Sequence, residues 1–227
     1  MIQIEEIAMS GELFDGRYKL LNPLSTDGGT ADVWLAIDMN TIDNPNLVAD
    51  DITEDETEES GMQVAIKIYR PKNALDIEGE QRFREEFRIV YNCHQTNLLQ
   101  PTHFSIYKDI PFLVLPFCQE GSAELMAGQG ADNDTLWKFV TDVSSGLAYL
   151  HACQPPIIHQ DIKPANILID DHHNYAITDF GISASFSNNK HGHAFDDGNV
   201  GTLAYMSPER FAEGYVPDAP ADIWALG

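Results

Sequence analysis

The spacing of apolar residues changes near residue 117. Before that point they come in short runs separated by polar or turn-forming residues, which is typical of strands. After it, apolar residues recur at intervals of three and four from Leu136 to Leu150, which predicts an amphipathic helix with Asp134 as its N-cap. A chain with strands first and helices later is expected to fold as an α+β protein. The predicted strands of the first half are 18–21, 33–37, 64–69 and 112–115.

A strongly acidic stretch interrupts the predicted strands. Residues 50–60 hold seven carboxylates and no basic residue, so they cannot bury a core and are expected to form a solvated loop. A regulatory or metal-collecting role is the alternative. The chain is therefore divided into an N-terminal extension, a β-rich part with an acidic insertion, and a helix-led part. Their bounds are 1–17, 18–116 with the insertion at 38–62, and 117–227.

Composition excludes several classes of partner. The chain has 227 residues, with 13 Lys and Arg against 36 Asp and Glu, and a formal net charge of −23. Nucleic acid and anionic membrane surfaces would repel it, so neither is an expected partner. The three cysteines are widely spaced and form no CxxC pair, which favours the reducing cytoplasm. No secretory signal and no apolar stretch of membrane-spanning length is visible.

A lysine lies inside the apolar run at 64–69. Lys67 could point to solvent from a sheet edge, but the helix predicted over 80–92 places Glu86 on or beside its own apolar stripe. An ammonium and a carboxylate that both face an interior need each other, because an unpaired buried charge is very costly. A Lys67–Glu86 pair would hold the ammonium ready for an anionic ligand. Glu85, the next residue round the helix, is the competing partner.

Two polar clusters follow short predicted strands in the second part of the chain. The first, at 159–166, brings an acid, a base and an amide into one loop, and the second begins at Asp179. Asn166 and Asp179 are oxygen donors of the kind that Mg²⁺ takes when phosphates and water complete its coordination. Asp161 could accept a proton from a hydroxyl, and Lys163 could neutralise charge on a phosphoryl group in transit.

The order of these motifs resembles that of a serine/threonine protein kinase, from residue 18 to the last residue. The shared features are a glycine-rich turn, VAIK at 64–67, the helix glutamate, HxDxKPxN at 159–166, DFG at 179–181, Gly201-Thr202, SPE at 207–209 and DIW at 222–224. The resemblance implies a two-lobed fold with a β-rich N-lobe and a helical C-lobe, and ATP and Mg²⁺ as cofactors. It also implies transfer of the ATP γ-phosphate to serine or threonine hydroxyls of protein substrates.

The resemblance assigns a role to each motif residue. Asp161 would be the catalytic base, Lys163 would contact the γ-phosphate, and Lys67 would bind the α- and β-phosphates while paired with Glu86. The residues implied to hold Mg²⁺ are Asn166 and Asp179. Those implied in the activation segment and the hydroxyl-acceptor site are Gly201 and Thr202. Those implied around ATP are Leu24, Thr26, Gly28, Gly29, Ala31, Val33, Ala65, Lys67, Leu115, Pro116, Cys118 and Leu168.

The connector after the predicted strand at 112–115 must offer one backbone carbonyl and one N–H if it binds the edge of an adenine base. Counting from Leu115, which resembles the gatekeeper, the base edge would meet the carbonyl of Pro116 and the N–H of Cys118. Proline keeps its carbonyl and lacks only the donor, so this placement is chemically consistent.

Two departures from the family pattern carry predictions. Thr26 and Ala31 stand where the first and third glycines of the loop would be, which predicts weaker nucleotide binding because side chains limit the approach of the backbone to phosphate. Gln160 replaces the arginine usual before the catalytic aspartate. Without that cation a phosphate on the activation segment loses an internal partner, so activity is expected not to depend strongly on phosphorylation of that segment.

The chain stops at Gly227, where the central helix of the large lobe would begin. We therefore expect a fragment or a truncated product of a longer kinase, whose lobe is completed by its missing C-terminal part. The alternative is that a partner chain completes the lobe. Asp222 resembles the residue that ties this helix to the catalytic loop. The alternative functions are a small-molecule phosphotransferase acting on aminoglycosides or sugars, and a nucleotide-binding scaffold of the pseudokinase kind.

Overall fold

The structure, a computed structural model, describes residues 4–25, 31–42, 61–70, 77–128, 130–180, 184–185, 202–212 and 214–227. The chain divides into two compact units, which are described separately. The first consists of Met1–Arg84 and Pro101–Phe117, and the second of Glu85–Gln100 and Cys118–Gly227. Strands dominate the first and helices the second, which confirms the α+β class predicted from the sequence.

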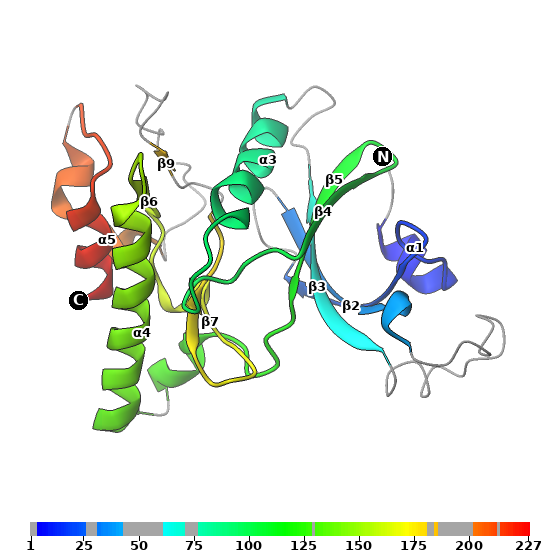
Figure 1. Cartoon of the computed structure of the whole chain (residues 1–227), viewed down its shortest axis with the longest axis horizontal. Coiled ribbons are helices and arrows are strands. Elements are labelled where there is room, and N and C mark those ends of the chain that lie inside the picture. The colour runs from blue at the N-terminus through cyan, green and yellow to red at the C-terminus, as the bar shows by residue number, and fades with distance from the viewer. Residues whose placement is uncertain are drawn as a thin grey trace. The chain divides into compact units, whose positions relative to one another are not determined.

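The first unit is built on a five-stranded antiparallel sheet in the order β1-β2-β3-β5-β4 (Figure 1). The predicted runs all lie in its strands, whereas β4 was not predicted. The strands are β1 (Tyr18–Ser25), β2 (Ala31–Asp38), β3 (Met62–Tyr69), β4 (His103–Tyr107) and β5 (Ile110–Pro116).

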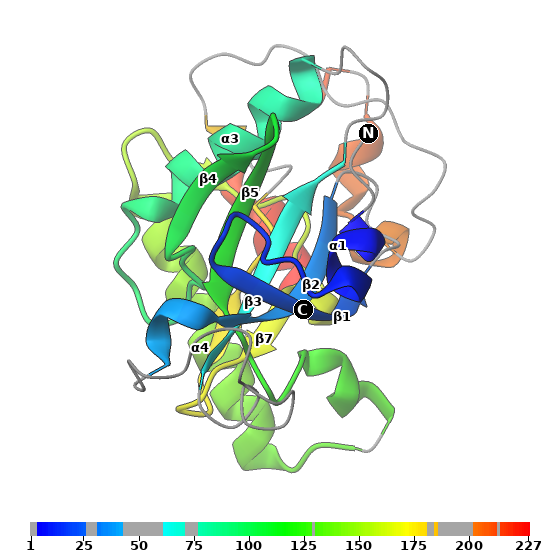
Figure 2. The same cartoon turned by 90° about the vertical axis from the view of Figure 1, so that its right-hand side faces the viewer.

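One face of this sheet is covered by the segment that precedes β1. Helix α1 (Ile4–Ser10) buries Ile4 and Ile7 against apolar side chains of the sheet (Figure 2). Phe14 is fully buried and meets Phe112 edge to face at 4.9 Å. The sheet residues in this core include Trp34, Ala36, Ile66, Ile68 and Val114. These positions alternate along their strands, so they share one face, and the N-terminal segment is part of the core of the unit.

An ion pair between Arg17 and Asp38 lies at the C-terminal end of β2. Asp38 caps the 3₁₀ helix η1 (Met39–Thr41) and receives two bonds from Arg17, Nε to Oδ1 at 2.8 Å and Nη2 to Oδ2 at 2.6 Å. This fork geometry is the strong form of a carboxylate–guanidinium contact. The bonds from Arg17 hold the pKa of the Asp38 carboxyl below its usual range.

The second unit has helix α4 (Asn133–Ala152) at its core. Val143, Leu147 and Leu150 are fully buried and pack with residues of β6 (Ile157–Ile158), β7 (Ile167–Ile169) and β8 (Tyr175–Ile177). Strand β7 pairs with β8, and β6 pairs with β9 (Ala184–Ser185). The remaining elements of this unit are η2 (Ala123–Gly128), η3 (Pro164–Asn166), η4 (Thr202–Tyr205), η5 (Pro208–Phe211) and α5 (Ala219–Leu226). Helix α3 (Ile77–Tyr91) contributes its first part to the first unit and its last part to the second.

Two details predicted for α4 were wrong. The N-cap is Asp132, whose carboxylate accepts the Thr135 N–H at 2.8 Å, while Asp134 already lies in the first turn. An N-cap side chain accepts a hydrogen bond from the backbone N–H two or three residues later. Asp132 directly precedes the first residue of the helix, so its carboxylate is placed to do so. Leu136 and Val140 are exposed, at 45% and 39%, whereas Phe139 packs against the core and Val143, Leu147 and Leu150 are buried in it.

Gly146 of α4 permits a close approach by another part of the second unit. A Cβ atom there would lie 2.8 Å from the carbonyl oxygen of Asn97 and 2.9 Å from the Ile177 side chain. The same carbonyl accepts the Ile177 N–H at 2.9 Å, and Asn97 Nδ2 donates to the Tyr175 carbonyl at 3.0 Å. The absence of a side chain at this position therefore allows the segment around Asn97 to join α4 to β8.

No helix in the described ranges is both long enough and apolar enough to cross a lipid bilayer.

Candidate functional site

In the first unit, Lys67 projects from the sheet face opposite the α1-covered core. Strand register sets Lys67 between Val33 of β2 and Leu113 of β5, and sets Ala65 between Leu35 and Leu115. Directly opposed residues share a face, so the structure brings together Val33, Ala65, Lys67 and Leu115, four of the residues predicted around a nucleotide. Lys67 is half-buried in this row.

The other predicted residues of the first unit lie at its strand ends. Ala31 begins β2 and is buried, Leu24 is 46% exposed near the end of β1, and Pro116 ends β5 opposite Val64. Thr26, Gly28 and Gly29 lie outside the described residues, as does Gly201 of the second unit. Thr202 begins η4, and only its backbone is described.

The two glutamates predicted as alternatives on α3 differ in burial. Glu86 is 6% exposed, whereas the Glu85 side chain is 50% exposed and lies 3.7 Å from Arg88. A buried carboxylate needs compensation and an exposed one does not. Burial therefore favours Glu86 over Glu85 as the residue that requires a cationic partner.

The predicted loop of the second unit brings three polar side chains into contact. Lys163 Nζ lies 2.9 Å from Asp161 Oδ2, and Asn166 Nδ2 donates both to Asp161 Oδ2 and to the Asp161 carbonyl, each at 2.8 Å. The 3₁₀ helix η3, with a proline in its first turn, turns the chain so that Asn166 reaches back to Asp161. These contacts fix the carboxylate through one of its two oxygens.

The second oxygen of the Asp161 carboxylate, Oδ1, does not share the contacts of Oδ2. Asp161 Oδ1 is buried and accepts no hydrogen bond from any residue in the described ranges. Buried carboxylate oxygens are normally hydrogen-bonded, and an exception indicates a functional group or an external partner. Oδ1 can therefore accept a hydrogen bond, and then a proton, from a hydroxyl brought to it.

His159 and Thr178 join this loop to the segment that carries Asp179. His159 is fully buried; its Nδ1 accepts the Asp161 N–H at 3.3 Å, and its Nε2 donates to the Thr178 carbonyl at 3.0 Å. The Thr178 N–H donates to the Asn166 carbonyl at 2.9 Å. His159 is thus a structural hydrogen-bonding residue, and the segments of Asn166 and Asp179 run side by side.

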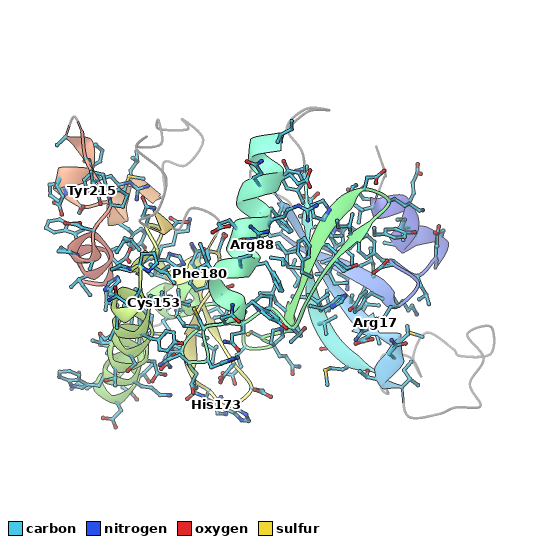
Figure 3. All side chains as sticks on the ribbon, turned by 45° about the horizontal axis from the view of Figure 1, so that its top comes forward. Arg17, Arg88, Cys153, His173, Phe180 and Tyr215 are labelled. Atoms are coloured by element: carbon cyan, nitrogen blue, oxygen red, sulfur yellow. The ribbon has the colours of Figure 1, made fainter. Side chains whose placement is uncertain are left out.

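Asp179 itself has an exposed side chain and a left-handed backbone, with φ of 64°. Phe180, the next residue, is labelled in Figure 3 and is 3% exposed. Its ring meets the His159 ring edge to face at 4.9 Å. An amide oxygen on Asn166 and a carboxylate on Asp179 form a hard-oxygen donor pair. Such a pair fits Mg²⁺ when phosphates and water supply the other ligands.

Asp222 of helix α5 binds the backbone of the loop at 159–166. The Asp222 side chain is fully buried and accepts the N–H of His159 at 2.8 Å and that of Gln160 at 2.7 Å. It also meets His151 Nε2 of α4 at 2.9 Å. The expectation that Asp222 ties this helix to the loop is confirmed.

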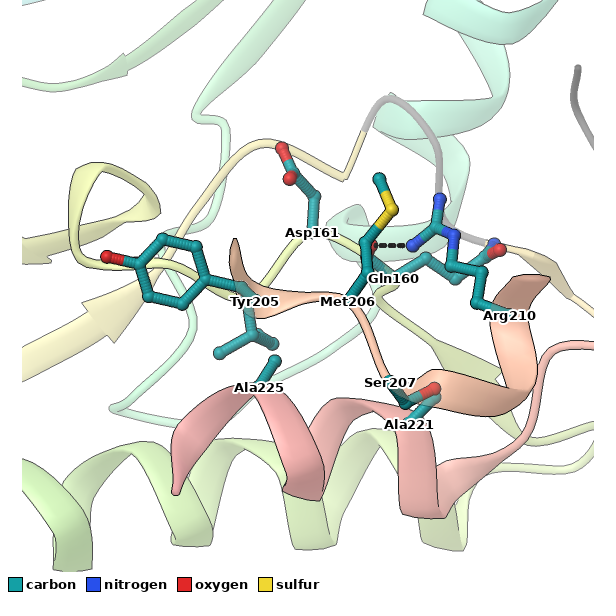
Figure 4. Close-up of a pocket in the computed structure, with 9 residues that line it drawn as sticks. Gln160, Asp161, Tyr205, Met206, Ser207, Arg210, Ala221 and Ala225 are labelled. Atoms are coloured by element: carbon teal, nitrogen blue, oxygen red, sulfur yellow. Dashed lines mark hydrogen bonds between the residues drawn. The ribbon is translucent and has the colours of Figure 1, made fainter. Parts of the chain in front are cut away.

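Sequence reasoning missed Arg210, a residue of η5. Its Nη1 donates to the backbone carbonyl of Gln160 at 2.6 Å (Figure 4). Arg210 lines a small pocket together with Asp161, Met206 and Ser207. The only signal in the sequence is an arginine directly after the SPE motif, and residue type alone does not reveal its partner 50 positions earlier in the chain.

Cys118 and Leu168 lie in the second unit. Cys118 is buried, and burial, with a smaller contribution from the charge of Asp170, raises the pKa of its thiol to about 11. Leu168 pairs with Ala176 in the β7–β8 ladder and forms a bridge with Ser122. At neutral pH the Cys118 thiol is therefore a neutral packing group, and only its backbone remains available for polar recognition.

Comparison with known proteins gives a consistent result. The sequence profile of the protein kinase domain matches residues 53–227. The serine/threonine-protein kinase PrkC of Bacillus subtilis is 31% identical over 219 residues, which cover 96% of this chain and 30% of PrkC. A calcium/calmodulin-dependent protein kinase kinase of Caenorhabditis elegans is 38% identical over 120 residues, covering 51% of this chain and 21% of the relative. A receptor-like protein kinase of Arabidopsis thaliana is 30% identical over 172 residues, covering 73% of this chain and 19% of the relative. The chain spans less than a third of the length of each of these relatives.

Proposed function

Because the chain belongs to the protein kinase domain family, we propose that it transfers the γ-phosphate of ATP to serine or threonine hydroxyls of protein substrates. The observation that carries this proposal is the state of Asp161. One carboxylate oxygen is fixed by Lys163 and Asn166, and the other is buried with no hydrogen bond from the described residues.

The proposed mechanism assigns a task to each residue of the loop. Asp161 Oδ1 orients the attacking hydroxyl and takes its proton as the new O–P bond forms. The bond from the γ-phosphorus to the β–γ bridging oxygen breaks in the same step, and ADP leaves. Lys163, already bonded to Oδ2, lies beside this reaction and neutralises charge on the transferring phosphoryl group. Asn166 holds the carboxylate in place, so that the reacting atoms meet in a defined geometry. Bound Mg²⁺, held by Asn166 and Asp179, would neutralise phosphate charge.

The nucleotide is proposed to bind the Lys67 face of the sheet. Val33 and Ala65 offer apolar surface to the adenine, with Leu168 as the third apolar contact, and the Pro116 carbonyl and Cys118 N–H serve its polar edge. Lys67 is proposed to bind the α- and β-phosphates, with the buried Glu86 as its proposed partner. Strand register and the burial of Glu86 support this assignment, and Thr26 and Ala31 in the loop predict modest affinity.

We further propose that residues 18–116 and 117–227 act as the N-lobe and C-lobe, with the cytoplasm as the site of action. All three cysteines are free thiols, which supports a reducing compartment. Helix α5 exposes Ile223 and Trp224 by more than half. Large apolar side chains exposed together mark an interaction surface, and a further segment of the C-lobe is the partner that we propose for it.

The test is transfer of labelled γ-phosphate from ATP with Mg²⁺. The acceptors are a basic protein rich in serine and threonine and, separately, a panel of sugars and aminoglycosides. We expect label on the serine and threonine residues of the protein, and loss of at least about a thousandfold in kcat for Asp161→Ala. Asp134→Ala, an exposed carboxylate on α4, is the matched control and should retain activity. Label on the small molecules alone would indicate a small-molecule phosphotransferase, and nucleotide binding without any transfer would indicate a scaffold.

A further inference from the structure

We infer that Arg210 is a positioning residue for the catalytic loop, acting on Asp161 through the backbone of Gln160. This inference rests on the proposed function, because Asp161 is the base only in that reaction. It adds a residue of η5 that lies outside the motifs from which the site was predicted.

The backbone of Gln160 needs external support. Its φ is 68°, in the left-handed region that residues with a Cβ atom rarely adopt because it is less favourable than the right-handed one. Asp161 follows directly, so the conformation at position 160 sets the direction in which the Asp161 side chain leaves the backbone. A loop that relaxed at this residue would turn the carboxylate away.

Charged groups hold both peptide groups of Gln160. Its N–H donates to Asp222 Oδ1 at 2.7 Å, and its carbonyl accepts Arg210 Nη1 at 2.6 Å. Figure 4 shows the Arg210 side chain reaching from η5 to this carbonyl. A hydrogen bond from a charged donor is stronger than one between neutral groups, so it can offset the cost of the left-handed conformation at Gln160.

The carbonyl that Arg210 binds belongs to the peptide whose nitrogen is that of Asp161. A rotation of this peptide would also disturb the Asp161 N–H bond to His159 Nδ1, which is already long at 3.3 Å. Arg210 therefore restrains the one peptide plane that links the anchor at Asp222 to the base. Position 160 is itself a glutamine, and the guanidinium that binds its carbonyl comes from Arg210 of η5.

The test compares Arg210→Met and Arg210→Lys with Arg88→Met as the matched control. Arg88 is also an arginine of the second unit, but its side chain is 75% exposed and it contacts Glu85 at 3.7 Å. For Arg210→Met we expect kcat to fall between about tenfold and a hundredfold, because about 1.4 kcal/mol corresponds to a factor of ten. The KM for ATP should change less than about twofold. Lysine should restore part of the rate, and Arg88→Met should behave as wild type.

A second readout does not require activity. Amide hydrogen exchange should become faster at Gln160 and Asp161 in Arg210→Met, with exchange at the α4 amides unchanged. Unchanged exchange at both residues, or a kcat within twofold of wild type while Asp161→Ala is inactive, would overturn the inference. A fall in kcat that only follows the folded fraction and is not restored by lysine would also overturn it. If wild type transfers no phosphate, the proposed function fails, and the exchange measurement still decides whether Arg210 holds the loop.

Discussion

Replacing Asp222 by asparagine tests how strongly the catalytic loop depends on its anchor. The wild-type carboxylate is fully buried and serves two backbone N–H groups and the His151 ring, at 2.8, 2.7 and 2.9 Å. Asparagine keeps the shape, but it replaces one acceptor oxygen with an NH₂ group that faces a donor. At least one charge-assisted bond, worth about 1.5–3 kcal/mol, is lost, and one buried N–H is left unpaired at about 1–3 kcal/mol.

The expected loss is about 3 kcal/mol in the free energy of unfolding, or a fall of about 6–12 °C in Tm. The assay is urea unfolding followed by helical circular dichroism, with amide exchange at His159 and Gln160 as a local probe. Asp218→Asn is the control on the same helix, because Asp218 is exposed at the N-cap and makes no capping hydrogen bond. It should change stability by less than about 0.5 kcal/mol. If Asp222→Asn lowers the free energy of unfolding by less than about 1 kcal/mol, or if both variants lower it equally, the loop does not depend on the Asp222 carboxylate as described.

Three further predictions follow from other parts of the chain. Gly146→Ala should destabilise by about 1–3 kcal/mol, because its Cβ would meet a backbone oxygen at 2.8 Å; the neighbouring Ser145→Ala should be near neutral in urea unfolding, and equal stability of both variants would contradict the packing argument. The pKa of Asp38 is lowered by Arg17, so this pair stabilises the fold above about pH 4 and loses that effect as the pH falls through the folded-state pKa; Asp38→Asn should therefore cost about 2 kcal/mol at pH 7 and progressively less as the pH is lowered through that pKa, and a cost that does not depend on pH would be inconsistent with this linkage. Because position 160 is glutamine, phosphatase treatment should leave turnover largely intact, and a loss of turnover that a phosphomimetic restores would show that prediction to be wrong.

The strands of the sheet were predictable because each is a run of apolar and β-branched residues between polar or turn-forming ones. Helix α1 was not predicted, because seven residues with two buried isoleucines are too short to display a helical period. Strand β4 was also not predicted. None of the residues of its sequence, HFSIY, is buried, and the segment forms a strand because it pairs with β5. The cap of α4 was misassigned because two aspartates stand two positions apart, and residue type does not distinguish them.

The site was predictable where its residues are close in sequence. Asp161, Lys163 and Asn166 lie in one loop, and their contacts follow from the turn at η3. Asp222 could be expected only through the family resemblance. Arg210 could not be expected, because its partner is a backbone carbonyl, which is present at every position of a sequence and is selected only by the folded geometry.

We propose that the phosphates of ATP bind beside Lys67 and Lys163. An acyl-phosphate derivative of ATP, which acylates lysines next to its phosphates, tests this claim directly when labelled peptides are quantified by mass spectrometry. We expect label on Lys67 and Lys163, and suppression of both by excess ATP with Mg²⁺. Lys138, which is partly exposed and pairs with Asp142 at 2.8 Å, should carry only weak label that ATP does not suppress. Equal labelling of all three lysines, unaffected by ATP, would contradict it.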